Sequence, residues 1–397
     1  MPVSSFAYAI PYLLVFLVLT VLCNYEFRLL EHNRATTRVR WMTFGLLWFF
    51  IGFRGFVFTD FISYYPWFEG LPSLWTGNTL STLDSDVETA FEPGFEPGFV
   101  LYAILCKSVI PNYFAWNITS AFIDLFILDR IFRRYSRYYA LSFLIFFVMG
   151  CAVLEFNILR NAKAILIFLL ALPYLKQRKP WKYFGMILLA TMFHVSSLLY
   201  FPLYFFLHRR WPKVVLLGIL LVGIAVTAGH IKFLFPILNA LGGIIGGRAG
   251  ALIEIYLNSD LYAQPYSLGI GYLERIITYL LVFFTYGKWQ DRTGDRYLFP
   301  NLYVLFFISF TCLWELGVAL ERISYLFMAS YWIFYPQLLA YCRTLGLKLA
   351  LFFYIFVLFG LKLTQQTSNI HLKYDNILFG IASFDTRKSV VKATLET

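Results

Sequence analysis

The chain has 397 residues, of which 60% are hydrophobic, 21% aromatic and 14% charged. Soluble domains contain about 25% charged residues, so this composition excludes an ordinary soluble protein. The formal net charge is +11, but the lysines and arginines gather in short clusters between apolar stretches, as the positive-inside rule predicts for loops of a membrane protein. The positive charge is therefore interpreted as a topology signal, and no nucleic acid is expected as a partner.

The apolar stretches predict an all-α, polytopic integral membrane protein whose single membrane domain covers residues 1–397. Most stretches are close to the ~20 residues that a helix needs to cross the bilayer, whereas barrel strands are shorter and alternate in polarity. We expect about 11–13 transmembrane or re-entrant helices in total. The five cysteines show no C-x-x-C spacing, so neither a metal site nor a disulfide framework is predicted, and no cofactor is expected.

The first two predicted spans, residues 8–23 and 41–58, enclose a basic loop. The positive-inside rule places this loop in the cytoplasm and the N-terminus outside. The arginines of the loop are Arg28, Arg34, Arg38 and Arg40.

Residues 59–99 carry seven acidic side chains and no lysine or arginine, which predicts an extracytoplasmic loop. Within it the sequence Glu-Pro-Gly-Phe occurs twice in succession, at residues 92–95 and 96–99, and such Pro-Gly pairs end any helix. Residues 99–110 are too short to span the membrane comfortably, so we expect an interfacial or re-entrant helix there. Residues 114–132 are long enough for the next span.

The next two predicted spans, 141–154 outward and 164–175 inward, flank a charged turn that contains Glu155, Arg160 and Lys163. An arginine inside a membrane costs roughly 2.5–3.5 kcal/mol on insertion scales, so such residues usually face a protein interior or a watery cavity. Arg160 and Lys163 are one helical turn apart and would share a face, where they suit a phosphate. The alternatives are a structural ion pair between Arg160 and Glu155, or a solvated turn at the ends of two spans.

Residues 183–207 allow two interpretations. One continuous helix would place the basic residues that follow it outside, whereas two half-helices that bend around His194 keep the basic residues at both ends inside. The charge pattern favours the bend. A lone histidine in an apolar helix is usually a satisfied interior residue, but at the tip of a bend His194 is also a candidate general base or phosphate donor.

The remainder continues this alternation of spans and loops. We predict a second extracytoplasmic loop at 248–271, then an extracytoplasmic polar tail over 364–397 that is mobile beyond Phe384. The spans predicted between these two segments are 272–286, 298–313, 323–341 and 349–363.

Five arginines fall at the outer ends of spans in this topology. Guanidinium groups bind phosphate oxygens in bidentate fashion, so five of them at one depth would suit a lipid-linked phosphate or pyrophosphate. The alternative for one or two of them is that they reach to lipid headgroups. The five are Arg54, Arg160, Arg248, Arg275 and Arg322.

At these positions the sequence resembles the EpsG/Wzy group of polysaccharide polymerases. The family's opening motif is an arginine, then Gly-Thr-Asp and a spaced tyrosine and phenylalanine. The similar residues here have Phe58 in place of the glycine, and they are Arg54, Thr59-Asp60, Tyr64 and Phe68. Glu96-Pro97, or its duplicate Glu92-Pro93, resembles the family's Glu-Pro element.

Three later motifs extend the resemblance over most of the chain. The stretch from Phe156 to Ala164 resembles Phe-Asn-x-x-Arg-Gln-x-x-Ala, with Asn161 in place of glutamine. Phe-His-x-Ser-Ser at 193–197 and Arg-Ile-Ser-Tyr at 322–325 are similar to the family's Phe-His-x-Ser-Ala and Arg-Ile-x-x-Tyr elements.

The resemblance implies a GT-C-like glycosyltransferase in the bacterial inner membrane, with an active site facing the periplasm or exterior. It would join oligosaccharide repeat units, carried on undecaprenyl pyrophosphate, into O antigen, capsule or exopolysaccharide. Its partners would be the lipid-linked glycan donor and acceptor, the lipid bilayer, a flippase and a chain-length regulator. The alternatives from other classes are a flippase or transporter of the same lipid-linked glycan, and an O-antigen ligase.

The motifs, together with the arginines at the outer ends of spans, supply the expected site residues, and no metal ligand is among them. Asp60 and His194 are the candidate general bases. Arginines that stabilise the departing pyrophosphate would need no metal. The residues expected to bind substrate are Arg54, Arg160, Lys163, Arg248, Arg322, Tyr64, Tyr325, Glu96 and Asn157.

Overall fold

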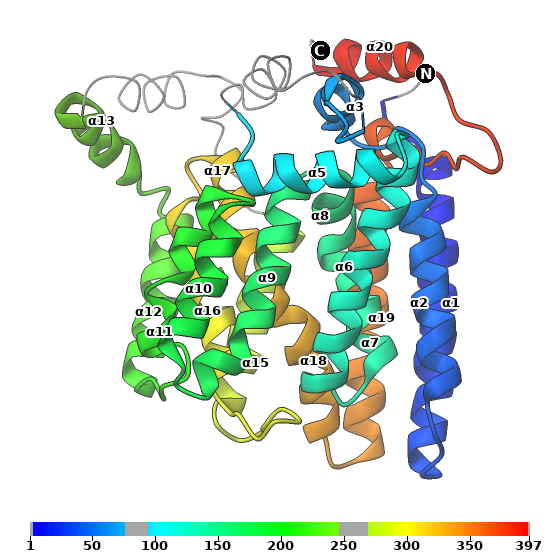
Figure 1. Cartoon of the computed structure of the whole chain (residues 1–397). Helices are drawn as coiled ribbons and strands as arrows, with labels where there is room; N and C mark the ends of the chain where they lie inside the picture. Colours follow the sequence, from blue (N-terminus) through cyan, green and yellow to red (C-terminus); the bar gives the residue numbers. More distant parts are fainter. Residues whose placement is uncertain (1–2, 76–93, 246–268, 396–397) are drawn as a thin grey trace. The chain divides into compact units, whose positions relative to one another are not determined.

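The structure, a computed structural model, describes residues 3–75, 94–245 and 269–395. Regular secondary structure in these ranges is helical, with isolated β-bridges in addition (Figure 1). The predicted all-α class is therefore confirmed. The chain divides into two compact units, one formed by Met1–Tyr204 with Tyr335–Thr397 and the other by Phe205–Phe334.

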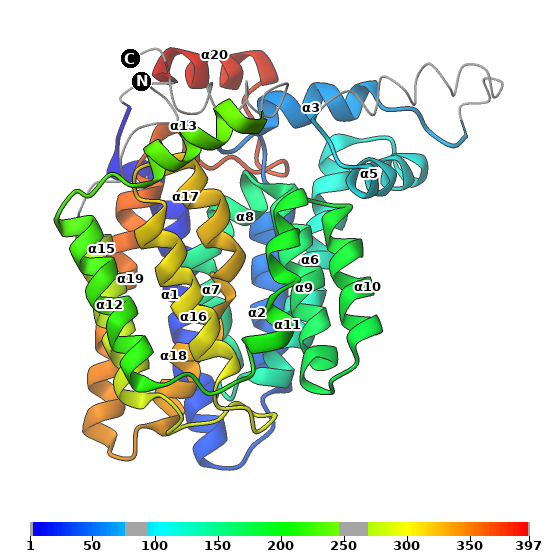
Figure 2. The ribbon, with the colours of Figure 1, turned by 90° about the vertical axis from the view of Figure 1, so that its left-hand side faces the viewer.

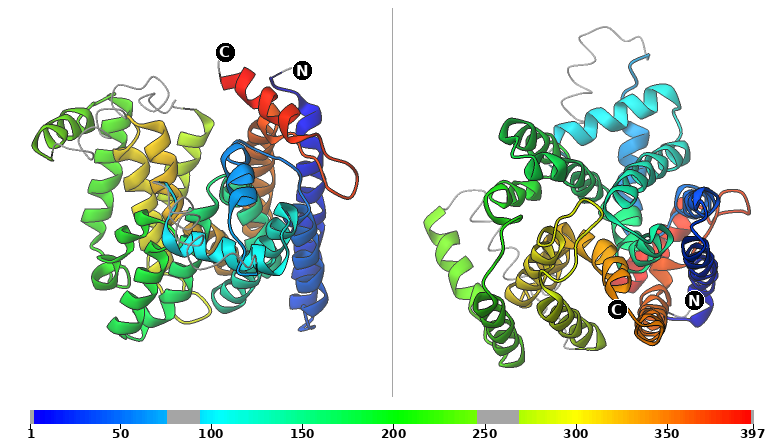
Figure 3. Two further views of the ribbon diagram at one scale, coloured as in Figure 1. Left: turned by 45° about the horizontal axis from the view of Figure 1, so that its top comes forward. Right: turned by 90° about the horizontal axis from the view of Figure 1, so that it is seen from below.

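In the first unit, three long helices stand side by side where the chain begins and ends (Figure 3). Ser5 caps the first of them by accepting a hydrogen bond from the backbone N–H of Ala7 at 3.3 Å. Thr344 caps the last by accepting from Leu347 N–H at 3.3 Å. The helices are α1 (Phe6–Glu31), α2 (Thr37–Gly52) and α19 (Leu345–Thr367).

The predicted short helix is α5 (Pro97–Val109), which lies across the end of the upright α6 (Tyr113–Tyr135) (Figure 1). Their axes differ by 117°. The bend follows from the local sequence, because Pro111 cannot continue a helix and Asn112 caps the new one by accepting hydrogen bonds from Phe114 and Ala115 N–H at 2.9 and 3.0 Å.

The charged turn lies at a break between helices. An apolar helix runs through α7 (Tyr139–Phe146), a π-helical segment (Phe147–Cys151) and α8 (Ala152–Phe156), and α9 (Leu159–Lys176) begins after it. Inserted π turns occur often at functional sites. The break places Asn157 and Arg160 at one end of the unit's helices.

The bend predicted within residues 183–207 is present. α10 (Pro180–Thr191) ends before His194, and a 3-10 helix (Val195–Tyr200) and α11 (Leu203–Phe206) return alongside it. Tyr183 Oη donates to the carbonyl of Tyr200 at 2.6 Å, and Arg178 donates to the carbonyl of Tyr204 at 3.0 Å, which fixes the two arms against each other. The continuous-helix alternative is excluded.

The C-terminal part differs from the predicted mobile tail. Beyond α19 the chain forms α20 (Phe384–Leu395), which lies at the same end of the unit as α3 (Phe61–Gly70) and α5 (Figure 2). Val391 is fully buried there, and buried Arg387 donates to three backbone carbonyls, those of Phe56, His371 and Lys373. The prediction of a mobile tail relied on the polar average composition of this segment, which does not show that Arg387 and Val391 are buried.

One apolar core lies beneath α3, α5 and α20. It combines aromatic residues of α3 and α5 with the first residues of α6 and α9, so elements far apart in the sequence are fixed together. Its buried members include Phe61, Tyr64, Phe68, Phe99, Trp116, Leu159 and Val391.

The second unit has its own packing. Tyr279 Oη donates to the carbonyl of Leu216 at 2.7 Å, and the buried carboxylate of Glu315 accepts hydrogen bonds from Phe233, Leu234 and Phe235 N–H at the start of α13. A carboxylate is favourable there because the start of a helix carries positive charge. The helices are α12 (Lys213–Ala228), α13 (Leu234–Ile245), α15 (Ile270–Thr285), α16 (Leu298–Cys312) and α17 (Gly317–Ser324), and α18 (Ala329–Tyr341) leads back to the first unit.

By length and composition, three helices of the described ranges could each cross a membrane: α1, the helix over 139–156 and α19. The bent pair α5 and α6 could form a fourth span. The polytopic membrane class is therefore confirmed. The predicted acidic loop is described only at residues 59–75 and 94–99, and the second predicted loop, at 248–271, only from residue 269.

Candidate functional site

The segment after α2 begins with Arg54, which points into the protein. Only 5% of Arg54 is exposed, and its guanidinium donates to the carbonyl of Ile51 at 2.6 Å and to Asn117 Oδ1 at 3.5 Å. The guanidinium carbon also lies 5.0 Å from the centre of the Phe156 ring. Arg54 therefore joins α2, α6 and α8 at the end where α8 breaks.

Thr59 and Asp60 are fixed to the same break. Thr59 Oγ1 donates to Asn157 Oδ1 at 2.8 Å, and the backbone N–H of Asp60 donates to the same oxygen at 3.2 Å. Asp60 is half-buried and precedes α3. The amide side chain of Asn157 thus positions Thr59 and Asp60, although the two motifs lie about 100 residues apart in the sequence.

Arg160 is the first cation after the break, and it contacts the start of α5. Its guanidinium donates to the carbonyl of Gly94 and to Glu96 Oε2, the latter at 2.7 Å, and lies 4.9 Å from the centre of the Phe95 ring. A quarter of the Arg160 side chain remains exposed. The guanidinium is thus oriented by the protein while part of the Arg160 side chain stays open to solvent.

Tyr64 lies beside Arg160 and is 4% exposed. Burial raises the pKa of its hydroxyl above the usual value, while the nearby Arg160 guanidinium, which its side chain hydrogen-bonds, acts in the opposite direction. The hydroxyl is therefore neutral at physiological pH, and its oxygen accepts the hydrogen bond from the guanidinium.

Glu96 connects Arg160 to the tip of the α10 bend. Its second oxygen, Oε1, accepts a hydrogen bond from Val195 N–H at 3.2 Å, and Gly98 N–H donates to the carbonyl of Met192 at 2.9 Å. A Cβ on Gly98 would lie 2.8 Å from that carbonyl oxygen, so glycine permits this close approach.

His194 caps the 3-10 helix at the tip. Its Nδ1 accepts from Ser196 N–H at 3.2 Å and lies 2.7 Å from Ser196 Oγ. A neutral ring that accepts at Nδ1 carries its proton on Nε2. In this arrangement His194 offers a donor at Nε2.

Lys163 lies one turn beyond Arg160 but points elsewhere. Its ammonium is ion-paired with Asp124 and donates to Ser120 Oγ at 2.6 Å, and both partners are on α6. Glu155 lies close to Asp124, and all four of these side chains are nearly fully buried. The alternative in which Glu155 neutralises Arg160 does not occur, because Arg160 pairs with Glu96.

Asn117, Ser120 and Asp124 were not anticipated from the sequence. They are three and four residues apart on α6, so they form one polar stripe along an otherwise apolar helix. This spacing could have predicted a buried polar contact along α6, since polar residues inside a span usually meet partners in the protein interior.

The five arginines expected to converge are divided between the first unit, the second unit and the residues outside the described ranges. Arg248 lies outside the described residues. In the second unit, Arg275 is buried with its guanidinium carbon 3.9 Å from the centre of the Phe310 ring, whereas Arg322 is exposed near the end of α17, and half-buried Tyr325 follows it. The first unit joins Arg54 and Arg160 through the break at 156–160.

Within the described ranges, no group of three His, Cys, Asp or Glu side chains has the geometry of a metal site.

The helices and the buried polar network define a polytopic membrane protein with a charged site at one end of its first unit. Residues 38–377 match the EpsG family, and the chain belongs to this family. The match includes all five motifs, from Arg54 to Tyr325. Searches of curated proteins and of solved structures found no match.

Proposed function

We propose that this protein polymerises surface polysaccharide by joining lipid-linked repeat units at the outer face of the inner membrane. The observation that carries the proposal is that four family motifs, separated by up to about 140 residues, meet around Arg160 and Glu96. Membership of the EpsG family supports the same activity.

In the proposed reaction, a sugar hydroxyl of one lipid-linked unit attacks the anomeric carbon of a second lipid-linked glycan, at the sugar bound to its pyrophosphate. The bond between that carbon and the pyrophosphate oxygen breaks, and undecaprenyl pyrophosphate leaves. The hydroxyl proton passes to Asp60 as the general base, whereas His194, which carries its proton on Nε2, donates a hydrogen bond to a phosphate oxygen. Negative charge increases on the leaving pyrophosphate, so a pre-oriented guanidinium stabilises the transition state more than the ground state.

Arg160 is the residue best suited to this role. Glu96 and the Gly94 carbonyl orient it, and part of its side chain remains exposed. Arg54 is buried and Lys163 is ion-paired, so we assign them supporting positions around the site. The expectation that Arg248 and Arg322 also bind the substrate stays a prediction from the sequence.

The experiment uses the purified full chain and one defined undecaprenyl-pyrophosphate-linked repeat unit. Longer glycans identify a polymerase, transfer to added lipid A identifies a ligase, and an unchanged substrate in detergent favours a transporter.

Three variants then test the site. We expect Arg160→Ala to lower the rate of chain extension at least about 100-fold, as for other oriented donors that stabilise a transition state. Arg160→Lys keeps the charge without the bidentate geometry and should be intermediate. Arg38→Ala, at an exposed position at the other end of the unit, should extend chains normally. Normal polymer length from a folded Arg160→Ala protein would remove Arg160 from the proposal.

A further inference from the structure

A pocket lies at the opposite end of the first unit from the candidate site, and the proposed reaction does not use it. Its volume is about 270 Å³. It opens between the end of α1, the turn before α7 and the start of α19. All three segments adjoin basic loops, and the charge pattern places these loops in the cytoplasm.

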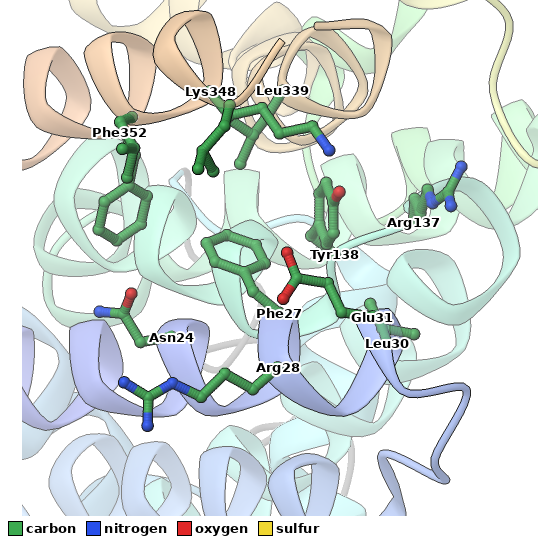
Figure 4. Close-up of a pocket in the computed structure, with 12 residues that line it drawn as sticks. Asn24, Phe27, Arg28, Leu30, Glu31, Arg137, Tyr138, Leu339, Lys348 and Phe352 are labelled. Carbon is green, nitrogen blue, oxygen red and sulfur yellow. The ribbon is translucent and has the colours of Figure 1, made fainter. Parts of the chain in front are cut away.

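The floor of the pocket is apolar and aromatic. The Phe27 ring lies edge-on to Tyr138 with 4.7 Å between ring centres, and edge-on to Phe352 at 5.5 Å. Leu30, Leu339 and other leucines complete the lining. Figure 4 shows Phe27 in the middle of this group.

Three cations surround this floor, each from a different segment: Arg28, Arg137 and Lys348 (Figure 4). Among the residues that the structure describes, none of the three forms an ion pair with a carboxylate within 4.0 Å. Glu31 is the acidic residue in the lining, so the pocket carries a net charge of about +2. Basic pockets between transmembrane helices on the cytoplasmic side are typical binding sites for anionic lipid headgroups.

Two neighbouring features suit a phospholipid in particular. The pocket includes the first turn of α19, where the start of the helix favours an anion. Exposed apolar side chains of α1 and α19 continue away from the pocket along the helices, among them Val21, Phe353 and Leu361. A headgroup phosphate in the pocket would thus leave acyl chains against an apolar surface.

We propose that this pocket binds the phosphate of an anionic glycerophospholipid from the cytoplasmic leaflet. The three cations bind the headgroup, and the apolar faces of α1 and α19 contact the acyl chains. A positive-inside loop that served topology alone would require neither a cavity nor cations gathered from three segments.

The test is native mass spectrometry of the full chain in mild detergent, titrated with phosphatidylglycerol or with phosphatidylethanolamine of the same acyl chains. We expect phosphatidylglycerol to bind at least about tenfold more tightly than phosphatidylethanolamine, because each cation near an anionic lipid contributes to binding. Equal retention of the two lipids by the unmodified protein would overturn the proposal.

Matched variants separate the pocket from general surface charge. Arg28→Gln/Arg137→Gln/Lys348→Gln should abolish the preference, whereas Arg34→Gln/Arg38→Gln/Arg343→Gln removes the same charge outside the pocket lining and should retain it. Glu31→Gln should tighten phosphatidylglycerol binding a few-fold, a gain that misfolding cannot produce. An equal loss in both triple variants would show diffuse attraction and overturn the pocket.

A competition experiment tests whether the pocket binds the phosphate of a lipid or that of a soluble compound. Millimolar inorganic phosphate or glycerol 3-phosphate should leave bound phosphatidylglycerol in place. Displacement by either would mean that the pocket binds a soluble phosphate compound, and the lipid assignment would be wrong.

Discussion

Phe58 has a φ of +73°, a left-handed backbone conformation that glycine adopts without strain. This is the position at which the family motif has glycine. Its backbone N–H donates to the carbonyl of His371 at 2.7 Å, which holds the loop in this conformation just before Thr59 and Asp60. Phe58 therefore holds a conformation that is strained for a side chain with a Cβ and that glycine would adopt without strain.

We predict that Phe58→Val lowers the free energy of unfolding by about 1–2 kcal/mol relative to Phe58→Gly, because a β-branched residue is an outlier at positive φ. Thermal or denaturant unfolding of the purified chain measures the difference. Phe53, with a φ of −91°, is the control, and there valine should be tolerated better than glycine. If valine at position 58 were as stable as glycine, the strain would be absent.

The buried ion pair of Lys163 and Asp124 links two helices of the first unit. The pair joins α9 to α6 in the interior, and Glu155 of α8 lies close to the same carboxylate. Removal of one member of a buried ion pair leaves an uncompensated charge, whereas removal of both can be nearly neutral.

We predict that Lys163→Met or Asp124→Leu alone lowers the free energy of unfolding by about 3 kcal/mol, and that the double variant regains most of this loss. Arg133→Gln is the control, because Arg133 is half exposed in its pair with Asp129 and should cost less than about 1 kcal/mol. Chain extension by the double variant tests the predicted substrate contact of Lys163. A stable but inactive double variant supports that contact, and an active one assigns Lys163 to structure.

At the scale of the whole first unit, the helices separate two ends of different character. One end carries the breaks, caps and buried contacts around Arg160, and α20 packs there. The other end carries the basic loops after α1, before α7 and before α19. The charge pattern predicts that the second end faces the cytoplasm.

Cysteine labelling of intact cells tests this orientation, with the native cysteines replaced. We predict that cysteines introduced at Arg34 and Gln177 are protected from an impermeant maleimide, while one at exposed Phe379 reacts. All three should react after permeabilisation. Labelling at Arg34 but not at Phe379 would mean that the protein has the inverted topology.

The sequence was sufficient for the class of protein, for several element boundaries and for the family. Hydrophobic stretches of spanning length have few alternatives to helices, because unpaired backbone groups are too costly in lipid. Pro111 and the tandem Glu-Pro-Gly-Phe predicted the short α5, and the charge pattern at residues 183–207 predicted the bend at His194. Each of these signals is local, so it can be read along the chain.

Only the tertiary structure decided which charges pair. Arg160 and Lys163 look equivalent in the sequence, yet the first pairs with Glu96 on α5 and the second with Asp124 on α6. Arg387 and Val391 likewise anchor a segment whose composition suggests mobility. The physical reason is that ion pairs and buried contacts depend on distances between residues far apart in the chain, and only the packing of helices sets those distances.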